Sequence, residues 1–201
     1  MIEKVFERNP KHTYEILKNS TVGIAGCGGL GSNAAAALVR SGVGSLVLSD
    51  FDRVELTNLN RQYFTSKHIG MYKVQALEQQ LVLINQEVKI RGVIKKLQAE
   101  DISETFNDCD VLIEAFDGAD SKKMIIETWR KVFPDRYVVC ASGMGGMTST
   151  QDLKIRRIGK IIICGDEKSS MELGLIAPRV ISVAMMQAME VLRILTASAG
   201  S

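Results

Sequence analysis

The sequence predicts an α/β fold of Rossmann type, with a doubly wound, mainly parallel sheet, a C-terminal antiparallel pair of strands and a closing helix. Two observations predict it. Short apolar stretches typical of buried strands alternate with helical patterns along most of the chain. A G-x-G-x-x-G motif, Gly26 to Gly31, lies between the first strand and the first long helix. The length of 201 residues suits one domain with a full core, so we expect residues 1–201 to form a single domain.

Each element follows from a local pattern. Strands are expected where aliphatic and β-branched residues run together, and helices where apolar residues recur at helical spacing. The predicted strands are Thr21–Ala25, Ser45–Ser49, Val88–Ile94, Val111–Phe116 and Tyr137–Ala141, followed by an antiparallel pair, Asp152–Ile158 and Ile161–Cys164. The predicted helices are Ser32–Arg40, Met71–Asn85, Ser121–Val132 and Arg179–Leu195, the last preceded by a polar loop over Gly165–Gly174.

Charge and hydropathy exclude several classes of partner. The chain has 25 basic and 23 acidic residues, a near balance that gives no electrostatic case for a nucleic-acid or membrane partner. No apolar run reaches about 18 residues, so we expect no transmembrane helix. The first residues lack the apolar stretch of a signal peptide, and we expect a cytoplasmic protein.

The cysteines and histidines carry little chemistry. The four cysteines are far apart and form no CxxC pair, so we expect neither a disulfide framework nor a zinc site. Cys27 is expected to fit the glycine turn as a small residue. Cys164 is either a thiol next to a mobile loop or, as we favour, a small buried residue at a strand end. Both histidines, His12 and His68, are expected in loops or on the surface.

The last helix is apolar around much of its circumference. Its three methionines, Met185, Met186 and Met189, accompany further aliphatic residues. Such a helix lies in a core or is buried at a subunit interface.

The glycine turn predicts a binding site for an ADP-containing nucleotide. Gly26 permits the tight turn, Gly28 lets the backbone approach a phosphate, and Gly31 lets the helix pack closely on the strand. Asp50 ends the second strand, where a carboxylate can accept hydrogen bonds from ribose hydroxyls. The alternative is a tight β–α turn without a ligand. The turn alone leaves NAD, FAD, S-adenosylmethionine and ATP open.

A polar cluster beyond the second strand favours a nucleoside triphosphate. Arg61 and Lys73 can neutralise phosphates, and Asn58 can donate a neutral hydrogen bond. A dehydrogenase has little need of these three residues together. The alternative is a solvated loop followed by a surface lysine.

Asp117 is expected at the ligand edge of the sheet. It follows an apolar strand, and in doubly wound sheets ligands bind beyond the carboxyl ends of strands. A single aspartate there can hold Mg²⁺ between phosphates. The alternative role is the N-cap of the helix that follows.

Taken in order, these motifs resemble one known superfamily. They are Gly-Cys-Gly-Gly-Leu-Gly from Gly26, Ser-Gly-Val-Gly from Ser41, Asp-Phe-Asp from Asp50, Asn-Leu-Asn-Arg-Gln from Asn58, and Lys73. The sequence resembles the ThiF/MoeB superfamily, whose fold also forms the adenylation domain of ubiquitin-activating enzymes. Glu114-Ala-Phe-Asp117, Ala141-Ser-Gly-Met144 and Ala177-Pro-Arg-Val180 are most similar to the short ThiF-like proteins of thiamine biosynthesis.

The resemblance implies an ATP-dependent adenylyltransferase. Its substrate would be the C-terminal Gly-Gly carboxylate of a small ubiquitin-like sulfur carrier of the ThiS kind. Asp117 would be the essential Mg²⁺-associated aspartate, and Arg8 would reach into the partner subunit's site of a homodimer, unless it is a plain surface arginine. Carried over by position, the ATP-binding residues would be Gly26, Gly28, Gly29, Gly31, Asp50, Asp52, Asn58, Arg61, Gln62 and Lys73.

The sequence departs from the superfamily at two points. It lacks the two CxxC pairs that bind zinc in many relatives, and Gly118 stands where many have asparagine after the aspartate. Two other functions therefore stay open. One is an NAD-dependent oxidoreductase, which the glycine turn and Asp50 would also serve. The other is a non-catalytic nucleotide-binding scaffold with the same fold.

Overall fold

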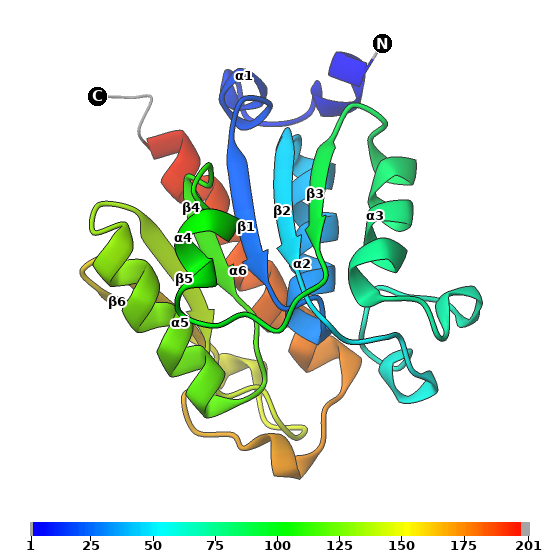
Figure 1. Ribbon diagram of the computed structural model, residues 1–201, viewed down its shortest axis with the longest axis vertical. Helices are drawn as coiled ribbons and strands as arrows, with labels where there is room; N and C mark the ends of the chain where they lie inside the picture. The colour runs from blue at the N-terminus through cyan, green and yellow to red at the C-terminus, as the bar shows by residue number, and fades with distance from the viewer. Residues whose placement is uncertain (1, 198–201) are drawn as a thin grey trace.

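The computed structural model describes residues 2–197 as three layers, with a sheet between two groups of helices (Figure 1). The sheet has seven strands in the order β3-β2-β1-β4-β5-β7-β6. Neighbouring strands are parallel except β6 and β7, which pair antiparallel at one edge. This is the predicted fold class, a Rossmann-like, mainly parallel sheet with a C-terminal antiparallel pair.

The elements follow each other in the predicted order. The strands are β1 (Thr21–Ala25), β2 (Ser45–Ser49), β3 (Lys89–Val93), β4 (Val111–Glu114), β5 (Tyr137–Ala141), β6 (Lys154–Ile158) and β7 (Ile161–Gly165). The helices are α1 (Thr13–Leu17), α2 (Gly29–Ser41), α3 (Lys73–Ile84), α4 (Asp101–Thr105), α5 (Ala119–Val132) and α6 (Ala177–Ala197). Short 3-10 helices lie at Ile2–Phe6, Leu56–Asn58, Ser66–His68, Thr150–Asp152 and Met171–Leu173.

Two apolar cores hold the layers together. Helices α2, α3 and α6 cover one face of the sheet, with buried side chains such as Leu38, Leu77 and Val183. Helices α4 and α5 cover the other, where Phe106 and Trp129 are fully buried. Since both faces are covered, the central strands are apolar throughout, as parallel strands require.

The strand order fixes where a ligand can bind. The chain runs from β1 outward through β2 to β3, then returns to place β4 on the other side of β1. At such a switch point the loops after β1 and β4 turn in opposite directions and leave a crevice between them. The glycine turn follows β1 and Asp117 follows β4, so the topology brings these motifs to one place.

Element boundaries differ from the expected ones mainly beside this crevice. Helix α2 begins at Gly29 rather than Ser32, because the Ser32 amide already donates to the Gly28 carbonyl over 3.0 Å. Strand β4 ends at Glu114 rather than Phe116, and Asp117 therefore lies in a turn. The five-residue helices α1 and α4 are too short to show a periodic pattern in the sequence.

Helix α6 is longer and more apolar than the sequence pattern indicated. By length and composition it could cross a bilayer, since one 18-residue window has a mean hydropathy of 1.5. Arg179, Gln187 and Glu190 interrupt its apolar run, and all three are buried in the fold. The helix packs against α2 and the sheet, so part of its apolar surface forms core. Met186 packs against that core, whereas Met185 and Met189 are exposed.

The histidines and cysteines are also placed. Both histidines were expected in loops or on the surface. His12 is exposed, whereas His68 lies in the connection between β2 and α3, in a short 3-10 helix, and is only 1% exposed. The His68 ring is buried because its Nδ1 accepts the Thr65 amide and closes the 3-10 turn. All four cysteines are free and buried. Burial raises the pKa of the Cys164 thiol to about 12, so this residue is the small buried one at a strand end that the sequence favoured.

Candidate functional site

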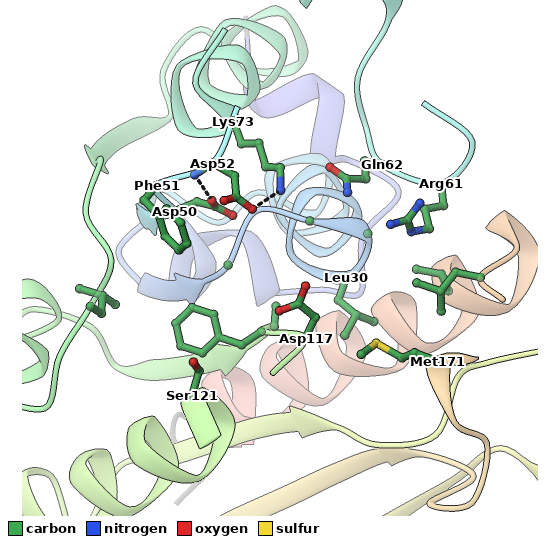
Figure 2. A pocket seen from close by; sticks show the side chains of 18 of the residues that line it. Leu30, Asp50, Phe51, Asp52, Arg61, Gln62, Lys73, Asp117, Ser121 and Met171 are labelled. Carbon is green, nitrogen blue, oxygen red and sulfur yellow. Dashed lines mark hydrogen bonds and ion pairs between the residues drawn. The ribbon is translucent and has the colours of Figure 1, made fainter. Parts of the chain in front are cut away.

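A cavity of about 570 Å³ lies at the carboxyl ends of β1, β2 and β4 (Figure 2). Its lining comes from segments far apart in the sequence: the glycine turn, the loop after β2, the start of α3, the turn after β4 and the start of α6. Nine of the predicted site residues line it. They are Gly26, Gly28, Gly29, Asp50, Asp52, Arg61, Gln62, Lys73 and, from the turn after β4, Asp117.

The glycines of the turn have distinct steric roles. Gly26 has a φ of 98°, which disfavours any residue with a side chain. A Cβ at Gly31 would lie 1.8 Å from the Gly26 carbonyl oxygen, so Gly31 allows α2 to pack on the turn and does not line the cavity. A Cβ at Gly28 would meet only Gln62 Nε2, at 3.8 Å. Gly28 therefore leaves open space in front of the amide-rich start of α2, where a phosphate fits.

Asp50 fastens the glycine turn to the loop after β2. One carboxylate oxygen accepts the Cys27 amide at 2.7 Å and the other accepts the Asp52 amide at 2.8 Å. Burial raises the pKa of Asp50, and these two hydrogen bonds and the nearby Lys73 partly offset that rise. Each oxygen keeps a second lone pair, so the carboxylate can still accept ribose hydroxyls from the cavity.

The cationic wall of the cavity is built from the loop before α3 and from α3 itself. Lys73 is 7% exposed and donates to Asp52 over 2.7 Å. Arg61 lies nearer the start of α2, with one guanidinium nitrogen bonded to the Thr57 carbonyl. Gln62, only 8% exposed, has no hydrogen-bond partner for its Oε1 within residues 2–197. A buried amide left unsatisfied beside two cations indicates a site built for a polar ligand.

Asp117 faces these residues from the opposite wall (Figure 2). It does not cap α5, because the N-cap residue is Gly118 and no side chain bonds the first amides. No hydrogen bond or ion pair engages its carboxylate in the described part of the chain. The N-cap alternative is therefore wrong, and the carboxylate is available to a ligand.

Besides Gly31, two predicted site residues lie outside the cavity. Asn58 is buried, and its Oδ1 accepts the Glu55 amide at 3.0 Å, closing the 3-10 turn that carries Arg61. Arg8 lies near the far end of α2, because its neighbour Asn9 donates to the Ser41 carbonyl. Since the 13 residues of α2 span about 20 Å, Arg8 cannot reach the cavity of its own chain.

The side chains that line the outer parts of the cavity were not predicted from the sequence. Phe51, Leu97 and Phe116 lie on its apolar walls, with Lys96 Nζ 5.8 Å from the centre of the Phe51 ring. Lys95 also lines the cavity and pairs with Asp101 over 2.5 Å. All follow strand ends, and that position is the one signal in the sequence that could have found them.

A loop from Asp166 to Leu175 covers the other end of the cavity. Met171 and Leu175 line that end, together with Leu30, Met144 and Val180. The loop is anchored by the buried pair of Asp166 and Arg179, 2.5 Å apart, although Asp166 belongs to the segment predicted only as polar. Hydrogen bonds from Ser169, Lys168 and Arg179 outweigh the effect of burial and lower the pKa of Asp166.

Within residues 2–197 no group of three or more histidine, cysteine or acidic side chains could hold a metal ion. The cavity instead offers one free carboxylate opposite two cations and a row of backbone amides. That donor set is typical of a site in which phosphate oxygens supply the remaining ligands of a divalent cation.

The fold and the site together define a nucleotide-binding domain of Rossmann-like class. The chain belongs to the ThiF family, whose model matches residues 4–200 under the description "ThiF family".

Curated relatives are of several kinds. The chain is 33% identical over 190 residues to the sulfur carrier protein ThiS adenylyltransferase of Bacillus subtilis, covering 90% of this chain and 55% of that protein. It is 35% identical over 158 residues to the tRNA threonylcarbamoyladenosine dehydratase of the same species, covering 75% and 60%. A segment of 77 residues is 47% identical to ubiquitin-like modifier-activating enzyme 5 of Drosophila willistoni, covering 38% and 19%. The chain thus spans between about a fifth and three fifths of these relatives.

Solved structures agree on the fold. E. coli tRNA N6-threonylcarbamoyladenosine dehydratase in complex with AMP superposes with a TM-score of 0.89 at 19% identity, covering 99% of this chain and 95% of that one. E. coli MccB with ATP superposes with a TM-score of 0.72 at 22% identity, covering 91% and 57%. Both neighbours were solved with an adenine nucleotide.

Proposed function

We propose that this protein is an ATP-dependent adenylyltransferase that activates the C-terminal Gly-Gly carboxylate of a ThiS-like sulfur carrier, in thiamine biosynthesis. The observation that carries the proposal is the cavity itself. Two cations, an unsatisfied buried amide and a free Asp117 carboxylate surround the open face of Gly28. Membership of the ThiF family and the ThiS adenylyltransferase relative support the choice of reaction.

The residues fit ATP in a definite order along the cavity. Asp50 would receive the ribose hydroxyls, with Phe51, Leu97 and Phe116 on the apolar side toward the base. Gly28 and Gly29 would present backbone amides to the phosphates. The charge of the phosphate tail would then lie between Arg61 and Lys73, with Gln62 as a polar contact.

The proposed chemistry needs no general base. A C-terminal carboxylate has a pKa of roughly 3.5 and is already ionised at neutral pH. ATP supplies the α-phosphorus that the carboxylate oxygen attacks, and the bond to pyrophosphate breaks. The protein's own contribution is to orient the two reactants and neutralise charge, for which Arg61 and Lys73 are placed.

Asp117 is the residue we assign to Mg²⁺. A divalent cation would bind through the Asp117 carboxylate and phosphate oxygens, since no group of three or more histidine, cysteine or acidic side chains in the described residues could hold it alone. Two other acidic side chains line the cavity, but Asp50 accepts two backbone amides and Asp52 is already paired with Lys73.

We further propose a cytoplasmic homodimer in which Arg8 of one chain completes the site of the other. Arg8 lies about a helix length from its own cavity and would have to act across an interface. The exposed Met185 and Met189 on α6 supply apolar surface for such an interface. The four free cysteines are consistent with a reducing compartment.

The alternative substrate is tRNA, which is suggested by the dehydratase relative that is 35% identical over 75% of this chain. Charge favours the protein tail. A tRNA-binding surface gains affinity from an excess of basic residues, and this chain has 25 basic against 23 acidic ones. An NAD-dependent oxidoreductase is less favoured, because no acid–base pair accompanies the cations in the cavity.

The deciding experiment is carrier-dependent ATP–pyrophosphate exchange with Mg²⁺. We expect exchange with a ThiS-like carrier that ends in Gly-Gly and none with the same carrier lacking its last glycine. ATP–pyrophosphate exchange that depends on unfractionated tRNA and not on a carrier would identify tRNA as the substrate. ATP binding with no exchange on either substrate would favour a scaffold, and NADH binding without ATP binding an oxidoreductase.

A further inference from the structure

Beside the Asp117 turn lies an ion pair that does not line the cavity, with a buried carboxylate and a partly exposed lysine. Glu114, the last residue of β4, is 0% exposed. Lys122, in the first part of α5, places its Nζ 3.0 Å from both carboxylate oxygens of Glu114. The pair thus spans the turn that carries Asp117, from the residue before it to the helix after it.

The same carboxylate also holds the backbone of that turn. Glu114 Oε1 accepts the Phe116 amide at 2.7 Å, one residue before Asp117. The Lys122 ammonium donates in addition to the Ala141 carbonyl at the end of β5, over 3.3 Å. A single pair therefore joins the end of β4, the Asp117 turn, α5 and β5.

The main chain on either side of the turn is fastened separately. The Ala115 amide donates to the Ala25 carbonyl at 2.8 Å, and Gln187 donates to the Glu114 carbonyl at 3.0 Å. The first helical hydrogen bond of α5 runs from the Lys122 amide to the Gly118 carbonyl. Between Ala115 and that bond, the hydrogen bond of the Phe116 amide is the one bond to a turn amide in the described residues. Without the Glu114 carboxylate, the peptide that presents Asp117 would lose this attachment.

A purely structural role is a poor explanation for the pair. Burying the Glu114 carboxylate costs much of what its attraction to the partly exposed Lys122 returns, and apolar replacement of both residues of such a pair is often as stable. Burial raises the pKa of Glu114, and Lys122 and the backbone amides reduce that rise. A carboxylate whose folded pKa is raised is easier to ionise in the unfolded chain, so its charge at neutral pH costs the fold stability.

We infer that Glu114 and Lys122 are positioning residues, whose ion pair fixes the turn that points Asp117 into the cavity. The inference rests on the proposed adenylation for its kinetic consequence and on the turn geometry for its structural one. A displacement of about 1 Å at such a group can cost on the order of 100-fold in rate, which gives the size of the expected effect.

The test uses the full chain with three variants. Glu114→Gln keeps the shape of the side chain but removes its charge, Lys122→Met removes the partner charge, and Lys123→Met is the control. Lys123 is exposed on α5, next in sequence to Lys122, and has no ion pair in the described residues. Lys122→Arg is the conservative variant, which can restore the pair.

Two readouts are needed. Amide hydrogen exchange of the segment 115–118 reports the turn and requires no activity, while the exchange assay gives kcat and KM for ATP. For Glu114→Gln and Lys122→Met we expect at least 10-fold faster amide exchange, confined to that segment. We expect kcat lower by 10- to 100-fold with little change in KM, and partial recovery in Lys122→Arg. The melting temperature should change little in Glu114→Gln, which removes the buried charge, and fall in Lys122→Met, which leaves the Glu114 carboxylate buried without its partner.

The two hypotheses fail in different ways. Unchanged amide exchange in residues 115–118 of both variants would overturn the positioning role, whatever the enzyme does. Faster amide hydrogen exchange spread over β4, β5 and α5 in both Glu114→Gln and Lys122→Met would also overturn it, since a general structural role would give that result. Absence of turnover in the wild type would contradict the proposed function, while the amide readout would still decide the positioning role.

Discussion

Lys73 Nζ lies 2.7 Å from the Asp52 carboxylate, and both side chains face the cavity in which phosphates are expected. Lys73 is almost fully buried, whereas about half of the Asp52 side chain is exposed. The ammonium is therefore held in place by a neighbour that solvent can still stabilise when the pair opens. This relationship makes Lys73 available to a triphosphate without leaving a buried carboxylate unpaired.

The first prediction concerns this lysine. Lys73→Met should weaken ATP binding by at least 10-fold, because a charge-assisted contact to phosphate is lost, and should weaken AMP binding less. The fold should persist, since the Asp52 carboxylate left behind is hydrated. Calorimetric titration of both nucleotides measures the effect, with Lys67→Met, an exposed lysine on the same segment, as the control. An equal loss of affinity for ATP and for AMP would show that Lys73 does not contact the β- and γ-phosphates.

The second prediction separates two glycines of one motif. Gly31→Ala should destabilise the protein by about 3 kcal/mol or more, because its Cβ would lie 1.8 Å from a backbone oxygen. Gly28→Ala should change the free energy of unfolding by less than about 1 kcal/mol but weaken nucleotide binding at least 10-fold. The added Cβ at Gly28 would clash with no protein atom but would occupy the space in which the phosphate is expected to bind. Urea unfolding and nucleotide titration of both variants check this. Unimpaired ATP binding by Gly28→Ala would show that no phosphate binds next to Gly28.

The third prediction concerns pH and His68. Burial, with help from Lys67, lowers the pKa of His68 below the ordinary 6.5. Its Nδ1 accepts the Thr65 amide and must therefore be unprotonated in the fold. Because the unfolded chain binds the proton more readily, stability should be full above about pH 6.5 and fall as the pH drops toward and through the folded pKa. The slope from this group cannot exceed about 1.4 kcal/mol per pH unit.

Urea unfolding between pH 8 and pH 5 measures this dependence. His68→Gln keeps an acceptor at the same place without a proton to gain, so its stability should vary less with pH over that range. An identical pH dependence in the wild type and the variant would assign the effect to other groups.

The fourth prediction tests the shared site of the proposed homodimer. Arg8→Ala and Asp117→Ala should each abolish ATP–pyrophosphate exchange while leaving the melting temperature within a few degrees of the wild type. After subunit exchange, random mixing should restore about one quarter of the activity, because half the dimers are mixed and each has one intact site. No recovery in dimers shown to be mixed would rule out an arginine acting across the interface.

Much of the fold followed from patterns that depend on neighbouring residues. Strands β1, β2 and β5 have the predicted bounds, because a buried parallel strand is a continuous apolar run and ends abruptly at polar or glycine residues. The glycine turn was also predictable, since its spacing reflects local steric needs at Gly26 and Gly31. Helices α1 and α4 were not predicted, because five residues show no period.

Within the site, residue type and local spacing predicted some of the cavity residues, whereas the position of others depended on tertiary packing. Asp50, Gln62, Lys73 and Asp117 were predicted to gather and do so. Asn58 was assigned to a phosphate, yet its amide closes a turn, a use that depends on the backbone of Glu55 coming within reach. His68 was expected in a loop or on the surface; it lies in the connection between β2 and α3, but its burial depends on packing and could not be predicted from the polar residues around it.

By itself the sequence determined the class of fold, the glycine turn and the family, since these rest on residue types at fixed spacing. Only the tertiary structure decided which side chains share the cavity, that Arg8 lies a helix length from it, and that Glu114 and Lys122 meet beside the Asp117 turn. The physical reason is range. Spacing records steric and hydrogen-bonding needs within a few residues, whereas the contacts that build the cavity join segments brought together only when the sheet and its helices pack.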